Sequence, residues 1–559
     1  MRFLFLLPLL ISRIPVLSEE TSESHRNHIV YLLKSQELSS SIDSYYKHKN
    51  KIGKHDFEVL EQMAVTLLEE GARSDDYEKQ LLSIFGTNLA SLSASIGILE
   101  SSIASQYPQT QVAAIQAIGS MQDDRCDELL IKAMSSPFFP VRMEAGYFLS
   151  MRKHRSAVGQ MESLMHKIPH PYQVIFPEFF ALIGTSDAIT VLKHMLEDKD
   201  ANIRVESILS AARHHRDDLL PILRAHAAHA NIAEQEACAA ALGYFKDTPS
   251  LVKLQKLSNG PARNVKLAAL RSLYAMGDQT AKDKICEIAK EGDLFAISTL
   301  GEIPGSEDLL YELTQNDCQH TRLNAAIALL QRKDPRCLRL LPEILFKDSR
   351  DLGFQPHLSL GRSFISWKVV GSAEQHQQHS PQDLEAITLA FREHVLRGCL
   401  ELPEKAFLDI AKIIFTYGQN DLVPLLIALL ENLQTDSAIT LLEGQSQKAG
   451  APFIRAYCNL ALFRLGKGSH YENLVKVWVS ERKNHEMIRF RPIVTHSMRI
   501  PDSRYELTAE ESSRLLVDSY QALADKHEEN CIDAILEMIK TGHPKNRYVL
   551  AGLLIRAIQ

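Results

Sequence analysis

Two tryptophans stand out in the sequence, because they are the only ones in the chain and both lie among basic residues. Large aromatic and arginine side chains dominate the binding energy of many protein interfaces. Both tryptophans fall where helical periodicity breaks down, so a core role in closing those breaks is the alternative interpretation. We predict that partner contacts come from these two segments, through Arg362, Trp367, Lys368, Trp478, Arg489 and Arg491.

Catalytic signatures are missing from the sequence. There is no nucleophile elbow, phosphate-binding loop or paired zinc-ligand spacing. The pair His485-Glu486 lacks the second histidine of a zinc-protease helix. His226 and His229 share a helical face, but we interpret them as surface residues rather than metal ligands. The sequence therefore predicts no catalytic, cofactor-binding or metal-binding residues, and a protein that is not an enzyme.

The charge balance limits the classes of partner. The 559 residues include 62 basic and 69 acidic side chains, which gives a formal net charge of −7. This balance argues against a DNA-binding protein, which needs a dominant basic face. Residues 476–504 are an exception, because seven basic and three acidic residues make this window locally +4. Weak contact with an anionic lipid or nucleic acid through this window is therefore an alternative expectation.

The N-terminus has the pattern of an export signal. Arg2 precedes the nine-residue apolar run Phe3–Ile11. Small or medium-sized side chains follow at Val16-Leu17-Ser18, where signal cleavage requires them. We predict a signal peptide at residues 1–18 and export to the periplasm, the cell surface or the medium. The alternatives are that these residues form a buried first helix or that the start codon is mis-assigned. In either case there is no signal, and the protein would be cytoplasmic. The apolar run is too short for a transmembrane anchor.

Helix pairs must position these segments. Ala201–His226 contains two narrow apolar stripes around a polar turn, which predicts two short helices that need neighbours to bury them. Similar units end their first helices at eight positions between Ile118 and Leu329, a mean spacing of about 30 residues. Repetition at this period predicts an all-α fold, a right-handed α-solenoid of stacked helix pairs with irregular insertions.

These units resemble HEAT-like repeats of the short bacterial form. The resemblance lies in a β-branched and a basic residue that open the first helix, followed by small residues. In the family, the basic residue joins neighbouring repeats near the turn, so the resemblance implies a structural role at five positions: Arg142, Arg204, Lys266, Arg322 and Arg455. The whole chain is also similar to HEAT-repeat proteins of chlamydia-like intracellular bacteria. Bilin lyases and alkyl-base DNA glycosylases carry such repeats too.

The chain divides by pattern into five parts. After the signal, we expect a helical cap at residues 19–108, a repeat array at 109–348, an irregular insertion at 349–383 and further helical repeats at 384–559, with 476–504 irregular. Within the cap, we expect residues 19–24 to be disordered and Lys47–His55 to form a basic, solvated turn. We also expect a helix that starts near Asp56 to end at Gly71. We expect the eight cysteines to be mostly buried free thiols, although bridges between repeats remain an alternative.

Taken together, these features predict a non-catalytic scaffold that binds another protein, outside the bacterial cytoplasm. The alternative is an enzyme or cofactor-assembly factor of the bilin-lyase-like class.

Overall fold

The computed structural model describes residues 14–90, 96–228, 231–346, 381–417, 422–448, 452–482, 486–489 and 509–559. In these ranges the regular structure is helical and contains no strand, which confirms the predicted all-α solenoid. None of the helices described there is both long enough and apolar enough to cross a membrane. The chain forms two compact units, the first comprising Met1–Glu144, Gly466–Ile493 and Leu507–Gln559, and the second Ala145–Leu465 and Val494–Glu506.

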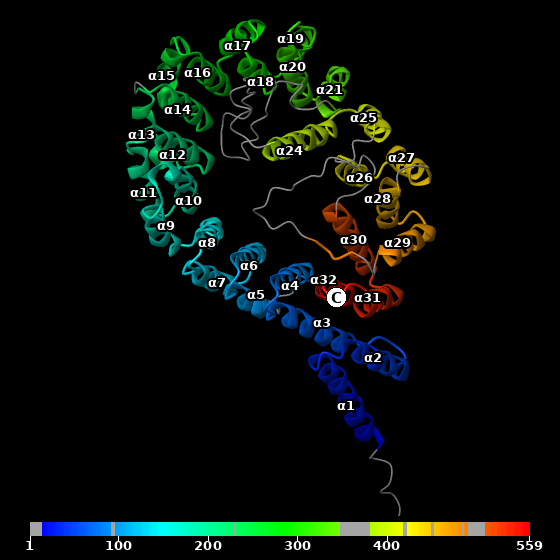
Figure 1. Cartoon of the computed structure of the whole chain (residues 1–559). Helices are drawn as coiled ribbons and strands as arrows, with labels where there is room; N and C mark the ends of the chain where they lie inside the picture. The colour runs from blue at the N-terminus through cyan, green and yellow to red at the C-terminus, as the bar shows by residue number, and fades with distance from the viewer. Residues whose placement is uncertain are drawn as a thin grey trace, which may run out of the picture. The chain divides into compact units, whose positions relative to one another are not determined.

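Unit 1 combines helices from both ends of the chain (Figure 1). Its N-terminal helices are α1 (Ile14–Lys34), α2 (Leu38–Ile52), α3 (Phe57–Ala72), α4 (Tyr77–Ala90), α5 (Ile96–Ile103), α6 (Pro108–Ser120), α7 (Arg125–Ala133) and the start of α8 (Phe139–Met151). Its C-terminal helices are α29 (Ser469–Arg482), α30 (Ala509–Ala524), α31 (Glu529–Thr541) and α32 (Arg547–Ile558).

The last helix of the chain, α32, packs directly on α3 and α4. Two glycines allow this approach, because a Cβ on Gly552 would lie 1.9 Å from the carbonyl oxygen of Gly86. Tyr548 lies beside them, fully buried, and its hydroxyl donates to Glu70 over 3.2 Å. The N-terminal helices of unit 1 therefore share one core with the C-terminal helices.

Unit 2 is a curved stack of helix pairs. From α9 to α21, Figure 1 shows the even-numbered helices on the concave side and the odd-numbered ones outside. The inner layer consists of α10 (Phe176–Ile183), α12 (Ala201–Arg213), α14 (Ile232–Tyr244), α16 (Arg263–Ala275), α18 (Leu294–Leu300) and α20 (Gln319–Gln331). The outer layer consists of α9 (Ala157–Met165), α11 (Ser186–Leu196), α13 (Leu220–His226), α15 (Leu251–Ser258), α17 (Thr280–Lys290), α19 (Glu307–Leu313) and α21 (Leu341–Phe346). The stack continues with α24 (Pro381–Cys399), α25 (Glu404–Tyr417), α26 (Val423–Leu433), α27 (Asp436–Gln447) and α28 (Pro452–Arg464).

A ladder of polar side chains recurs at steps of 31 residues along these repeats. Its members are Gln80, Gln111, Arg142, Gln173 and Arg204. Four of them donate to a backbone carbonyl oxygen in the turn before their own helix, and Gln173 donates to the carbonyl oxygen of Met165 at the end of α9. The hydroxyl of Ser105 also donates to Gln80, and that of Ser136 donates to Gln111, both over 2.7 Å. The ladder begins at Gln80, upstream of the expected start of the array at residue 109.

The family-implied joining role of the basic residue is confirmed at Arg204, which pairs with Glu234 of the next repeat. Arg142 and Arg322, by contrast, show a contact with the turn before their own helix. Arg142, Arg204 and Arg322 each donate to the carbonyl oxygen six residues upstream, over 2.7, 2.5 and 3.0 Å. Such bonds satisfy carbonyl groups at the turns, where no helix supplies a donor. For Lys266 and Arg455 the joining role stays a prediction.

Several local predictions in unit 1 are wrong. Residues 19–24 belong to α1. The basic stretch Lys47–His55 is mostly helix, because α2 continues to Ile52 and ends at Gly53, which adopts the left-handed conformation at φ 77°. The first seven residues of the window 476–504 continue α29.

Asp56 does cap α3, by accepting a hydrogen bond from the amide of Val59. Gly71, however, lies inside that helix, where a Cβ would meet the ring of Tyr548 at 2.7 Å. The glycine therefore serves close packing rather than helix termination.

The cysteines follow the expected pattern. All eight are free thiols; six are buried, Cys286 is half-buried and Cys318 is exposed.

Candidate protein-binding site

A pocket of about 290 Å³ opens on the inner layer of unit 2, where α14, α16 and α18 lie side by side. Its volume is at the small end of the ~300–1,000 Å³ range of ligand clefts. Small residues form much of its wall, together with larger polar and aromatic ones. The main lining residues are Glu236, Ala240, Tyr244, Ala268, Arg271, Tyr274, Ala275, Phe295, Thr299 and Glu302.

The pocket exists because α14 and α16 approach each other closely. A Cβ on Gly243 would lie 2.1 Å from the hydroxyl oxygen of Ser272, so only glycine fits there. The Ser272 hydroxyl in turn donates to the carbonyl of Ala239 over 2.7 Å. The alanines beside this contact are too short to fill the space toward α18, which leaves the hollow.

Charged and aromatic side chains stand around the pocket. Arg271 donates to both carboxylate oxygens of Glu302, over 2.7 and 2.8 Å, in a bidentate pair. Tyr244 is 42% exposed, and its hydroxyl lies 3.0 Å from Nε2 of His215. A planar guanidinium and an exposed tyrosine ring can contact a peptide through hydrogen bonds and apolar surface together.

A half-buried ionic network lies on α10 and α12 of the same layer. Arg213 pairs with both Glu178 and Glu206, and His214 lies 2.9 Å from Glu178. Burial raises the pKa of Glu206 despite Arg213. Burial also opposes the charge on Glu178, but His214 and Arg213 outweigh it and lower the pKa of that carboxyl. Because one arginine spans carboxylates from α10 and α12, the network joins neighbouring repeats.

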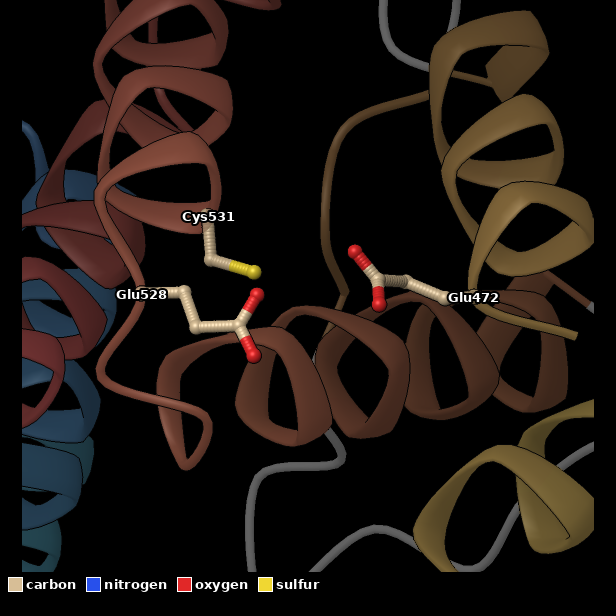
Figure 2. Close-up of side chains that lie close together, drawn as sticks. All are labelled: Glu472, Glu528 and Cys531. Atoms are coloured by element: carbon tan, nitrogen blue, oxygen red, sulfur yellow. The ribbon is translucent and has the colours of Figure 1, made fainter. Parts of the chain in front are cut away.

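A second cluster lies in unit 1, between α29 and α31. Figure 2 shows Glu472, Glu528 and Cys531 pointing toward one another, with their candidate ligand atoms within 4.8 Å. Thiolate and carboxylate are ligand types that zinc accepts. Lys476 already donates to Glu472 over 2.5 Å, and burial raises the pKa of Cys531 to about 11. A cation would have to displace both a proton and Lys476, so we interpret the cluster as a contact between helices.

The structure gives only a partial view of the predicted partner-binding residues. Arg362, Trp367, Lys368 and Arg491 lie outside the described residues, as do His229 and the insertion up to residue 380. Trp478 is half-buried on α29. Arg489 is exposed on the extended piece 486–489, and its amide donates to Ser513 over 3.0 Å.

Two histidines of unit 2 have structural roles. His226 is buried against Glu234, with its Nδ1 3.0 Å from the carboxylate, and is therefore not the surface residue that we expected. His214 belongs to the ionic network described above.

Sequence reasoning missed the pocket between α14 and α18. The available signal was the combination of Gly243-Tyr244 and Leu273-Tyr274 at the ends of adjacent first helices, with alanines one turn earlier. It could have indicated aromatic side chains above a small-residue surface. The hollow itself depends on the position of a third helix, α18, which the pattern does not give.

Comparisons with known proteins agree with the repeat architecture. The family model described as PBS lyase HEAT-like repeat matches residues 110–136, which span α6 and α7. No curated protein sequence matches the chain significantly.

Solved structures with a similar arrangement share little sequence with this chain. The complex of CpcE and CpcF of phycocyanin lyase from Nostoc sp. PCC7120 is 18% identical, with 40% of this chain and 94% of that chain covered and a TM-score of 0.27. Importin beta is 13% identical, with 94% and 76% covered and a TM-score of 0.29. Kap121p bound to Ste12p is 12% identical, with 98% and 63% covered and a TM-score of 0.28.

Residues 110–136 therefore match a HEAT-like repeat, and the described helices of the chain stack in pairs as an α-solenoid.

Proposed function

We propose that this protein is a non-catalytic scaffold that binds another protein through the inner layer of unit 2. The observation that carries the proposal is the pocket between α14 and α18, with Tyr244 and the Arg271–Glu302 pair around it. Solenoids present extended concave surfaces on which partners make many modest contacts around a few anchors.

The pocket supports a protein partner better than a cofactor. Its volume of about 290 Å³ suits one or two amino-acid side chains. A side chain from the partner would enter the hollow, while its main chain lies along the exposed ring of Tyr244. The predicted segments around Trp367 and Trp478 are two further contact segments in this proposal.

We also propose that the protein acts outside the cytoplasm of a bacterial cell. The pattern of residues 1–18 supports this proposal. Mass spectrometry of the protein from its native cell tests it, because export by this route predicts a mature N-terminus near residue 19 in the exported fraction. An intact Met1 on cytoplasmic protein would contradict it.

The experiment for the binding proposal is affinity purification from the native cell with the wild type and three variants of the protein. We expect Tyr244→Ala and Arg271→Ala to lose a partner that the wild type retains at stoichiometric level. Tyr311→Ala is the matched control, because Tyr311 is 41% exposed but lies on α19 in the outer layer.

Equal recovery of every partner by all versions would contradict the placement of the site. A stoichiometric bound chromophore or other cofactor in the purified protein would favour the lyase-like alternative.

A further inference from the structure

The junction between α2 and α31 in unit 1 contains a cluster of ionisable side chains that the proposed function does not use. Its members come from the N-terminal helices, from the turn between α2 and α3, and from α31 near the C-terminus. They are Arg26, Tyr45, His48, Lys49, His55, Asp56 and Asp533.

One half of the cluster holds the N-terminal helices together. Asp56 accepts from Arg26 of α1 over 2.9 Å and lies 2.9 Å from Nε2 of His48 on α2. Burial disfavours the Asp56 carboxylate, but His48, the amide of Val59 and Arg26 outweigh it and lower its pKa. These contacts therefore persist at mildly acidic pH.

The other half contains one of two ion pairs that join α2 to α31, the second being Lys540 with Asp43. Lys49 donates to both carboxylate oxygens of Asp533, over 2.9 and 2.7 Å. The same ammonium lies 2.9 Å from Nε2 of His55. Nδ1 of His55 lies 2.8 Å from the hydroxyl oxygen of Tyr45, which is fully buried.

The contact with Lys49 favours a neutral His55. When Lys49 donates to Nε2, the ring nitrogen must offer a lone pair, and the single ring proton then lies on Nδ1 toward Tyr45. A second proton on Nε2 would face the ammonium of Lys49 at 2.9 Å, inside a site where the His55 side chain is 1% exposed. One carboxylate, Asp533, would then have to balance two cations.

We propose that the α2–α31 junction is an acid-sensitive latch, in which protonation of His55 displaces Lys49 from Asp533 and releases the α1–α2 hairpin from α31. The groups that face His55 are Tyr45 and Lys49 from α2, and Asp533 and Glu529 from α31. Helices α3, α4 and α32 contain no histidine, and their contact holds the rest of unit 1 together.

The direction of the pH effect follows from linkage. Burial lowers the pKa of His55 below its ordinary value of 6.5, and Lys49 lowers it further, while Asp533 and Glu529 oppose these effects. A released His55 is solvated and binds a proton more readily than the latched one. The released state is therefore favoured as the pH falls below 6.5, and the latch is closed above it.

Hydrogen exchange measured by mass spectrometry on the full chain tests the latch. Protection of α2 amides, corrected for the intrinsic pH dependence of exchange, should fall by up to about tenfold between pH 7.5 and pH 5.5. The amides of α32 serve as the internal reference and should keep their protection. His55→Gln, which cannot ionise, should abolish the pH dependence, while His154→Gln at an exposed position of unit 2 should not.

A second variant covers the case in which His55→Gln disturbs the fold. Lys49→Met keeps His55 but removes the cation that binds Asp533, so α2 should be less protected than in the wild type at pH 7.5. A protonated His55 can then pair with Asp533, so protection should not fall further at pH 5.5. Unchanged protection of α2 in the wild type would overturn the proposal. The same pH dependence in wild type, His55→Gln and Lys49→Met would overturn it as well.

Discussion

Replacement of Arg204 by methionine tests how strongly the polar ladder joins the repeats. Arg204 donates to the carbonyl of Asp198 and to Glu234, whose side chain is fully buried on the next inner helix. The variant keeps the aliphatic part of the side chain but leaves the Glu234 carboxylate with one cationic donor fewer. His226 stays in place at 3.0 Å.

The expected cost is about 3 kcal/mol in the free energy of unfolding. Removal of one partner from a buried ion pair costs ~3–5 kcal/mol. The lower end applies because His226 remains and because the Arg204 side chain is 17% exposed. Arg155→Met is the control, since the Arg155 side chain, 76% exposed, pairs with Asp187 on the surface. Such surface pairs contribute ~0–1 kcal/mol.

Denaturant unfolding and hydrogen exchange of α12 and α14 amides provide the two readouts. Local exchange is needed because repeat arrays can unfold in parts. Adding Glu234→Gln to the Arg204 variant should restore part of the loss, since the buried charge is then gone. A cost below about 1 kcal/mol for Arg204→Met, equal to that of Arg155→Met, would refute the reasoning.

The difference in the free energy of unfolding between the wild type and Arg204→Met should depend on pH with a defined sign. Burial opposes ionisation of Glu234, but Arg204 and His226 outweigh it and lower the pKa below the ordinary value of 4.5. The stabilisation that Glu234 provides in the wild type is therefore present above pH 4.5 and is lost as the pH falls through the folded-state pKa. The difference between wild type and Arg204→Met should shrink in that acidic range.

Two further predictions concern single residues. Gly552→Ala should destabilise unit 1 by ~1–3 kcal/mol, because the added methyl group clashes with the carbonyl of Gly86. Gly444→Ala on the open face of α27 is the control and should stabilise the protein by ~0.5–1 kcal/mol. Equal effects of the two variants in thermal unfolding would contradict the packing of α32. Cys318 is exposed and the amide of Thr321 lowers its pKa, whereas burial raises the pKa of Cys238. Iodoacetamide should therefore modify Cys318 first in the folded protein. Equal labelling of the two cysteines, measured by peptide mass spectrometry, would contradict this.

The repeat fold could be predicted because its signals are local. Apolar stripes in Ala201–His226 indicate two helices without reference to the rest of the chain, and the structure has α12 and α13 there. The ladder could be predicted only in part, because the repeat pattern calls for a basic residue and the ladder also contains Gln80 and Gln111. A side-chain amide donates to a turn carbonyl as a guanidinium does. The 31-residue period of the ladder could therefore have been predicted from hydrogen-bonding capacity rather than from charge.

Contacts between distant parts of the chain could not be predicted in the same way. Gly71 has the sequence signature of a helix stop, yet its role is set by Tyr548, hundreds of residues later. The basic stretch Lys47–His55 was expected to be solvated, because nothing nearby in the sequence indicates Asp533 as its partner. The pocket also requires three helices in register, which a single repeat does not specify.

The central claim is that a partner protein occupies the inner layer of unit 2, and site-specific photo-crosslinking tests it most directly. A photoreactive phenylalanine analogue would replace Tyr244 in one version of the protein and Tyr311 in another, each expressed in the native cell. The account predicts a discrete protein adduct from position 244 and none from position 311. Adducts from 311 alone, or from neither position, would contradict it.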